Sequence, residues 1–285
     1  MDINNGFEKF FSGRWIAGAH IEDALEVAKK FNSKNITAII NYLGEAIRDK
    51  DKIEATVDRY LFIISKIKEN NLNAEISLKP TQLGLGFDEK LLFNSYAKIV
   101  GEARRNNIFV WLDMEENNFV DDTIKLYYSQ TNSKNTGICI QAYLKRSIID
   151  VKDITKKDGI IRLVKGAYKE SSDVAFQDME EITKNYVELM RYLFENSKRF
   201  MIATHDLSII ELAKNLNKRY NRTIEYAMLN GIRNRYAVRL AKEGKNVYIY
   251  VPFGEQWTKY AYRRLREGGH ALLILKSLFE KQSID

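Results

Sequence analysis

The chain of 285 residues carries 45 Lys and Arg against 38 Asp and Glu, a formal net charge of +7, and 45% of its residues are hydrophobic. This composition excludes a disordered chain, and a single cysteine, Cys139, excludes an internal disulfide framework. The two prolines, Pro80 and Pro252, are too few for a Pro-rich linker between domains. We therefore expect residues 1–285 to form one domain.

The positive charges are mixed with negative ones along the whole chain, without a zinc-finger, RNP or basic-region pattern. No nucleic-acid partner is therefore expected. The first residues lack the basic and then apolar pattern of a signal peptide, and the apolar runs are far shorter than the roughly 18 residues of a membrane span. These features predict a cytoplasmic protein. Residues 271–279 have an amphipathic pattern that predicts a helix packed on the protein or, alternatively, docked at the inner face of a membrane.

Short runs rich in Val, Ile and Tyr alternate along the chain with longer charged segments of helical period. A first helix is expected over residues 21–31, where apolar side chains share one face. Eight apolar runs then predict strands at residues 36–41, 74–79, 108–114, 136–142, 160–165, 200–205, 223–229 and 246–251. The clearest helices between them are expected at residues 51–70, 88–106, 172–196 and 207–218.

Continuous apolar strands separated by helices indicate a parallel sheet that is covered on both faces. Eight such units at this length predict an α/β fold of the closed (β/α)8 TIM-barrel type, with an extra N-terminal helix and a final helix over the barrel mouth. An open doubly wound sheet is the alternative. In a barrel, the active site lies on the loops that follow the strands.

Polar or amphipathic side chains occur at or soon after the ends of all eight predicted strands. They are Glu45, Lys79, Asp113, Gln141, Lys165, His205, Asn230 and Tyr250. Any one of them alone could be a helix cap or a solvated turn residue. Because a barrel brings all eight to one rim, their convergence favours a functional site.

The segment after the last strand has its own pattern. In a helix, Tyr260, Arg263, Arg264 and Glu267 lie on one face. Guanidinium groups bind carboxylate oxygens in a bidentate manner, so this face suits a small carboxylate with an apolar body. The alternative is a surface helix in which Arg and Glu side chains pair with one another.

These residues carry a family resemblance. The stretch Tyr250-Val251-Pro252-Phe253-Gly254, followed by Tyr260, Arg263, Arg264 and Glu267, resembles the closing signature of proline dehydrogenases, the flavin-dependent barrel enzymes of proline catabolism. Further similar motifs follow one another in barrel order. They are Gly18-Ala19-His20, Leu43-Gly44-Glu45, Leu78-Lys79-Pro80-Thr81-Gln82, Trp111-Leu112-Asp113-Met114-Glu115, Gln141-Ala142-Tyr143, Arg162-Leu163-Val164-Lys165-Gly166-Ala167-Tyr168 and Ala203-Thr204-His205.

The resemblance implies a role for each matched residue. The proline carboxylate would be held by Lys79, Arg263 and Arg264. The substrate ring would pack against Leu229, Tyr250 and Tyr260. Catalytic positions match Asp113 and Arg162. The surroundings of the FAD match Met114, Gln141, Arg162, Val164, Lys165, Gly166, Ala167, Thr204 and His205. Glu45 matches a carboxylate that pairs with the first arginine of the doublet and gates the site.

The resemblance also implies the reaction, namely FAD-dependent oxidation of L-proline to 1-pyrroline-5-carboxylate, the first step of proline catabolism to glutamate. Electrons would pass to a membrane quinone, and the product to a separate 1-pyrroline-5-carboxylate dehydrogenase. Ala227 and Asn230 depart from the family pattern, which more often has Gln and an aromatic or aliphatic residue beside Leu229. Hydroxyproline oxidation on the same fold therefore stays as an alternative.

The residues also bear on other chemistries. Lys79 or Lys165 at a strand end could form a Schiff base, as in a barrel aldolase or lyase. Cys139 lies in the middle of an apolar strand, which predicts a buried, inert thiol. No metal site is expected, because the three His residues lack ligand spacing.

Overall fold

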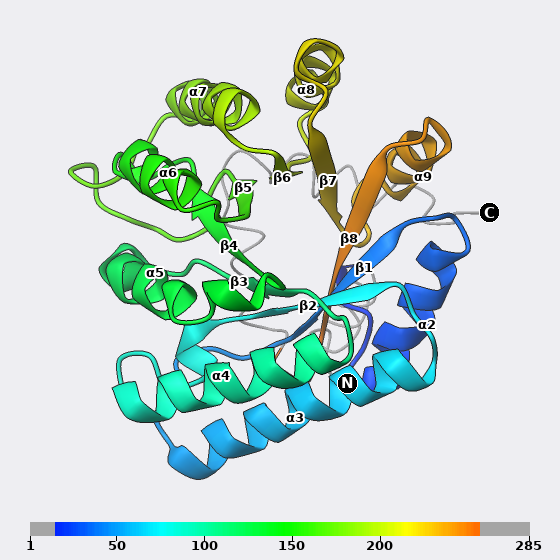
Figure 1. Ribbon diagram of the computed structural model, residues 1–285, viewed down its shortest axis with the longest axis vertical. Helices are drawn as coiled ribbons and strands as arrows, with labels where there is room; N and C mark the ends of the chain where they lie inside the picture. Colours follow the sequence, from blue (N-terminus) through cyan, green and yellow to red (C-terminus); the bar gives the residue numbers. More distant parts are fainter. Residues whose placement is uncertain (1–14, 257–285) are drawn as a thin grey trace, which may run out of the picture.

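A computed structural model of the protein describes residues 15–256, and these form a closed barrel of eight parallel strands in chain order (Figure 1). The strands are β1 (Thr37–Tyr42), β2 (Ala74–Leu78), β3 (Val110–Leu112), β4 (Thr136–Gln141), β5 (Ile161–Val164), β6 (Arg199–Ala203), β7 (Thr223–Leu229) and β8 (Asn246–Phe253). The last strand closes the barrel by pairing with the first, with Tyr250 opposite Ile39. The predicted (β/α)8 barrel is therefore confirmed, and the open sheet is excluded.

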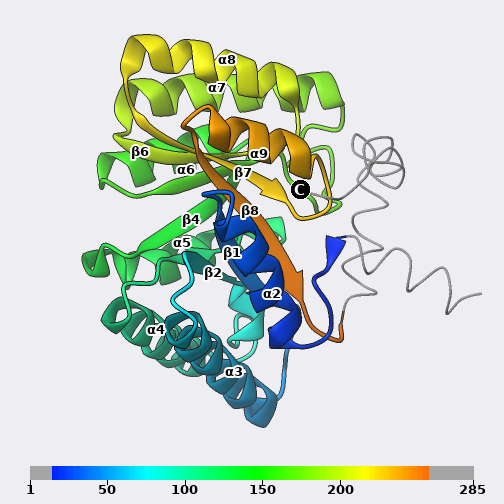
Figure 2. The same ribbon diagram turned by 90° about the vertical axis from the view of Figure 1, so that its right-hand side faces the viewer.

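Helices surround the barrel on the outside (Figures 1 and 2). They are α2 (Ile21–Asn32), α3 (Lys50–Glu69), α4 (Glu89–Arg105), α5 (Val120–Tyr128), α6 (Ser147–Lys156), α7 (Met179–Asn196), α8 (Leu207–Tyr220) and α9 (Asn234–Lys242). The expected extra helix is α2, which precedes β1 and packs against both β1 and β8. It therefore covers the seam where the barrel closes. The expected final helix and the 271–279 segment lie outside the described residues.

Local sequence signals account for where several helices begin. Four N-cap aspartates, which accept hydrogen bonds from backbone N–H groups of the first turn, precede α3, α4, α7 and α8. The predicted helix over residues 172–196 was wrong at its start, because α7 begins only after its cap, Asp178. Ahead of that cap, Ala175 forms an isolated antiparallel bridge with Leu144.

The turns that lead into the strands share one backbone feature. A residue with positive φ occurs two or three positions before seven of the strands, namely Asn35, Asn71, Asn107, Lys134, Asp158, Asn221 and Gly244. Asparagine tolerates this left-handed conformation better than most residues do. These turns all lie at the end of the barrel opposite the mouth.

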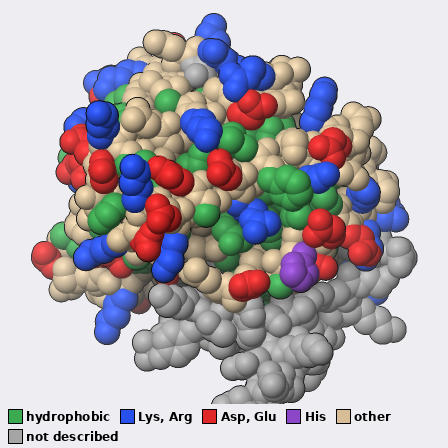
Figure 3. All heavy atoms as spheres, turned by 90° about the horizontal axis from the view of Figure 1, so that it is seen from below, with side chains coloured by type: hydrophobic (Ala, Val, Ile, Leu, Met, Phe, Trp, Pro, Cys, Tyr) green, Lys and Arg blue, Asp and Glu red, His purple; other side chains and the backbone are tan. Residues whose placement is uncertain are grey.

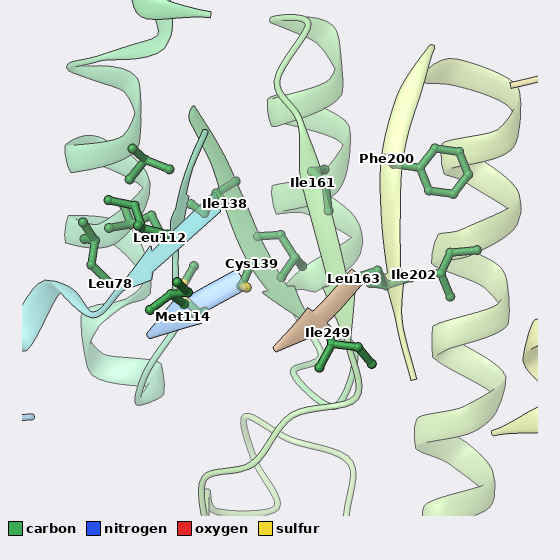
Figure 4. Packing of buried hydrophobic residues seen from close by; sticks show 14 of the residues in the cluster. Leu78, Leu112, Met114, Ile138, Cys139, Ile161, Leu163, Phe200, Ile202 and Ile249 are labelled. Carbon is green, nitrogen blue, oxygen red and sulfur yellow. The ribbon is translucent and has the colours of Figure 1, made fainter. Parts of the chain in front are cut away.

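Alternation along the strands separates two apolar cores. Outward-facing side chains such as Leu112, Ile138 and Leu163 are buried in the main cluster (Figure 4). A smaller cluster, which includes Ile39, Trp111 and Met201, comes from inward-facing positions. The barrel is thus filled with side chains and is not a pore.

On the face seen in Figure 3, Lys and Arg side chains of the described residues are interspersed with Asp and Glu, with apolar groups between them. Within residues 15–256, none of the helices combines the length and the apolar character that crossing a bilayer would require.

Candidate active site

An ion pair lies inside the barrel, near the mouth. Arg162 of β5 contacts Asp113, which follows β3, and both side chains are buried. Ser77 of β2 completes the contact, because its hydroxyl accepts a hydrogen bond from Arg162 Nη2 at 3.0 Å and donates one to Asp113 Oδ1 at 2.7 Å. Removing two charges from water is unfavourable unless they pair and form further hydrogen bonds. This arrangement meets that requirement.

Aromatic rings flank the Arg162 guanidinium. Its central carbon lies 5.2 Å from the centre of the Trp111 ring and 5.4 Å from that of Tyr250. The Tyr250 hydroxyl also donates a hydrogen bond of 2.8 Å to Asp113 Oδ2. Burial opposes the charge on Arg162, but Cys139 and Asp113 raise its pKa above the usual range. The guanidinium is therefore a permanently charged group in one orientation.

Cys139 is part of the same cluster. Its Sγ accepts a hydrogen bond from Arg162 Nε at 2.7 Å and lies 3.6 Å from Asp113 Oδ1. Burial raises the pKa of the thiol to about 12, so it stays protonated at neutral pH and is a poor nucleophile. The expectation of a buried thiol is confirmed.

A second ion pair lies at the rim. Lys79, directly after β2, places its Nζ 2.8 Å from Glu45 Oε2 and 3.3 Å from the hydroxyl of Tyr168. Only 9% of the Lys79 side chain is exposed, against 22% for Glu45. The pair therefore joins the loops after β1 and β2, with its carboxylate on the more exposed side.

The loop after β2 is held in place by buried polar contacts. Pro80 begins a 3-10 turn, and the Gln82 side chain accepts a hydrogen bond of 3.2 Å from the Lys79 backbone N–H. Glu115 accepts two more, from the Thr81 backbone N–H at 2.9 Å and the Thr81 hydroxyl at 2.7 Å. Burial raises the pKa of Glu115, while the charge of Lys79 opposes that rise. These contacts fix the position from which Lys79 extends.

Two adjacent strands, β4 and β5, carry buried polar atoms that lack a partner among the described residues. Gln141 of β4 donates from Nε2 to the Met114 carbonyl at 3.3 Å, but its Oε1 is buried without a hydrogen bond, as is Nη1 of Arg162. Buried polar atoms are normally satisfied by protein, water or ligand. An acceptor on β4 and a donor on β5 are thus available to a bound molecule.

The segment after β5 approaches a tyrosine ring. Gly166 has φ +120°, and a Cβ at this position would lie 2.1 Å from an atom of the Tyr143 ring. Only glycine fits there. Val164 ends β5, and Ala167 follows the glycine. Lys165 contacts Thr183 of α7 at 2.9 Å and Asp206, the N-cap of α8, at 3.2 Å, so its amine joins the rim to two outer helices.

The residues after β6 contact the neighbouring strand and helix. His205 Nε2 accepts a hydrogen bond of 3.2 Å from the Leu229 backbone N–H at the end of β7. The Thr204 hydroxyl accepts one of 3.1 Å from the Asp206 backbone N–H. These contacts hold both residues at the rim.

The structure therefore brings Asp113, Arg162 and Tyr250 into direct contact and pairs Glu45 with Lys79. Three of the sequence-predicted substrate residues, Tyr260, Arg263 and Arg264, lie outside the described residues. Among residues 15–256, no group of three or more His, Cys, Asp or Glu side chains is arranged to hold a metal ion.

Sequence reasoning missed three contributors to the site, namely Ser77, Trp111 as a neighbour of Arg162, and Tyr168. A signal for the first two existed. Inward-facing residues occupy every second strand position, so Ser77 shares a face with Lys79, and Trp111 shares one with Asp113. Tyr168 lies in a loop, where no such periodicity applies.

Comparison with known proteins identifies the family. Residues 24–275 match the family model described as proline dehydrogenase. The chain is 32% identical over 260 residues to proline dehydrogenase 2 of Bacillus subtilis strain 168, covering 90% of this chain and 86% of that protein. It is 33% identical over 273 residues to proline dehydrogenase 1 of the same strain, covering 94% and 90%.

A solved structure shares the fold. The barrel matches proline utilization A from Bdellovibrio bacteriovorus, inactivated by N-propargylglycine, with a TM-score of 0.87 and 23% identity. The match covers 98% of this chain but only 35% of that one, so the present chain spans about a third of the larger protein. With the family model matching most of the sequence and two relatives above 30% identity, the chain belongs to the proline dehydrogenase family.

Proposed function

We propose that this protein oxidises L-proline to 1-pyrroline-5-carboxylate, with bound FAD as the electron acceptor. The observation that supports this most directly is the Asp113–Arg162 pair under Tyr250, which puts a permanent positive charge and an aromatic ring at the mouth of the barrel. Family membership points to the same reaction.

The residues present fit a flavin. Its ring system offers both N–H and C=O groups, which match the unpartnered Gln141 Oε1 and Arg162 Nη1 among the described residues. The absence of a side chain at Gly166 lets the backbone after β5 pack closely against the Tyr143 ring. We propose that the cofactor is held by Met114, Gln141, Arg162, Val164, Lys165, Gly166, Ala167, Thr204 and His205. When bound, FAD supplies the two-electron acceptor that no side chain can provide.

The chain's own residues would bind and orient the substrate. We propose that Lys79, Arg263 and Arg264 hold the carboxylate of proline, since cations form strong hydrogen bonds to carboxylates. Leu229, Tyr250 and Tyr260 would pack around the ring. Fixing the carboxylate and the ring together sets the reacting carbon in one place and excludes water.

Asp113, Arg162 and Glu45 would have distinct roles. Arg162 is placed to stabilise negative charge that develops beside it, and Asp113 holds it in position through their ion pair. Glu45, on the exposed side of its pair with Lys79, would exchange that partner for an arginine when the site closes and so act as a gate.

The absorption spectrum tests the proposal directly. Purified protein reconstituted with FAD should be yellow, and proline added without oxygen should bleach the flavin band. A colourless protein that takes up no FAD would contradict the proposal.

We further propose that a membrane quinone accepts electrons from the reduced enzyme, which docks at the inner membrane face. A separate 1-pyrroline-5-carboxylate dehydrogenase would consume the product. Turnover with a soluble quinone tests the electron acceptor, and co-sedimentation with vesicles tests the docking.

Hydroxyproline is the alternative substrate, because Ala227 and Asn230 alter the wall beside Leu229. The ratio of kcat/KM for the two imino acids decides between them. The Schiff-base alternative is disfavoured by the contacts of both lysines, since Lys79 and Lys165 are bound to carboxylates at 2.8 and 3.2 Å. Borohydride trapping with a carbonyl substrate should leave the protein unmodified.

A further inference from the structure

A second charged cluster lies inside the barrel, further from the mouth. It consists of Glu75 near the start of β2, Arg199 at the start of β6 and Glu225 near the start of β7, and we call it the lower charged cluster. Arg199 Nε donates to Glu225 Oε1 at 2.8 Å, whereas its contact with Glu75 Oε1 is 3.7 Å. The site described above uses none of these residues.

The lower charged cluster contains two carboxyl groups but one guanidinium. Because Arg199 is closer to Glu225, the shortest contact of Glu75 is with a neutral donor, the indole N–H of Trp111, at 2.6 Å. Only 8% of Glu75 is exposed. Burial and then the charge of Glu225 raise the pKa of Glu75 to about 7. Glu75 is therefore a group that gains or loses its proton near neutral pH.

Trp111 connects this cluster with the candidate active site. Its N–H bonds Glu75, and the centre of its ring lies 5.2 Å from the Arg162 guanidinium carbon. Charges separated by one buried ring interact far more strongly than they would across water. The charge of Arg162 favours ionised Glu75, and such coupling is reciprocal, so the charge of Glu75 acts on the surroundings of Arg162.

We propose that Glu75 is a positioning residue for Arg162: through Trp111 and through its own charge, it sets the positive potential that Arg162 presents to the flavin. This role rests on the proposed function. Five groups from five strands face Glu75, namely Trp111 on β3, Arg162 on β5, Arg199 on β6, Glu225 on β7 and Tyr248 on β8.

The expected sign follows from the charges. Ionised Glu75 offsets part of the positive potential of Arg162 and disfavours electron uptake by the flavin, whereas neutral Glu75 does not. The reduction potential of the wild-type holoenzyme should therefore fall with rising pH more steeply around neutrality than that of Glu75→Gln, which stays neutral. The reduction potentials of the two proteins should coincide below about pH 6. Above about pH 8 they should differ, with the potential of Glu75→Gln higher than that of the wild type.

Spectroelectrochemical titration of the FAD-loaded protein across this pH range tests the proposal. Trp111→Phe keeps an aromatic ring but removes the N–H that favours ionised Glu75. The pH range in which the reduction potential of this variant falls steeply should therefore move to higher pH. This variant also keeps the test valid if Glu75→Gln does not fold. Glu54→Gln, in an exposed pair of α3, is the matched control and should follow the wild type.

Two results would overturn the role of Glu75, and they can be told apart. If wild type and Glu75→Gln give parallel curves while proline reduces both, Glu75 has no influence on the flavin and the proposed function stands. A wild-type protein that binds no FAD, or whose flavin proline does not reduce, removes the proposed function and this role with it.

Discussion

Asp113 and Arg162 meet inside the barrel although β4 lies between their strands. Cys139 of β4 contacts both side chains, so the intervening strand adds to the pair rather than separating it. The ion pair therefore connects three neighbouring strands, and removing one of its partners should affect folding as well as catalysis.

Replacing Asp113 by Ala leaves the Arg162 guanidinium buried without its counter-ion. Breaking a buried pair in this way should lower the free energy of unfolding by about 3–5 kcal/mol, measured by urea denaturation. Asp58→Ala, which removes an exposed pair with Lys98, should change it little. An equal loss of unfolding free energy in Asp113→Ala and Asp58→Ala would show that the buried pair contributes no more to stability than an exposed one.

Lys79→Met should weaken substrate binding. A hydrogen bond to a charged group contributes about 1.5–3 kcal/mol, so KM for proline should rise about 10- to 100-fold while the flavin spectrum is unchanged. Lys98→Met, at an exposed position of α4, is the control. An unaltered KM in the Lys79 variant would place the carboxylate elsewhere.

The raised pKa of Glu75 predicts a specific dependence of stability on pH. In the unfolded chain the carboxyl ionises near its ordinary value of 4.5, but in the folded protein only near about 7. The stabilising contribution of protonated Glu75 is therefore fully present below the unfolded-state pKa. It is lost as pH rises through the folded-state pKa, which lowers the free energy of unfolding by about 3 kcal/mol. Glu75→Gln should lack this part of the fall, so denaturation at acid and alkaline pH should show the variant gaining relative to wild type.

Gly166→Ala should lower stability by about 2–4 kcal/mol, because the new Cβ would overlap the Tyr143 ring and the backbone is left-handed there. Flavin retention should fall with it. Gly101→Ala in α4 is the opposite case, since its Cβ would meet nothing closer than 4.0 Å, and it should add about 0.5–1 kcal/mol. Thermal unfolding and the bound-flavin ratio check both.

Site residues at the ends of strands can be predicted from the sequence, because parallel strands in a barrel all end at one rim. Lys79, Asp113 and Tyr250 were identified in this way. The direction of Lys165 was not, since its partner Thr183 lies on a helix 18 residues further along. Charge pattern likewise could not locate the start of α7, because both the loop and the helix are polar.

The lower charged cluster shows a different limit. Glu75, Arg199 and Glu225 lie near the starts of their strands, so the rule that functional residues follow strand ends does not mark them. Their sequence separation hides the contact, and only the closed barrel brings β2 within reach of β6 and β7. Alternation marks each one as inward-facing, but which inward residues touch depends on the three-dimensional closure.

The seam of the barrel has a practical consequence. Ala17 N–H donates to the Pro252 carbonyl, and Gly254 N–H to the Gly18 carbonyl, each at 2.9 Å. Residues 15–18 thus run beside the end of β8, at the entrance to the barrel. For immobilisation on a surface, the asparagine turns at the opposite end are the anchoring points that leave the entrance open to proline.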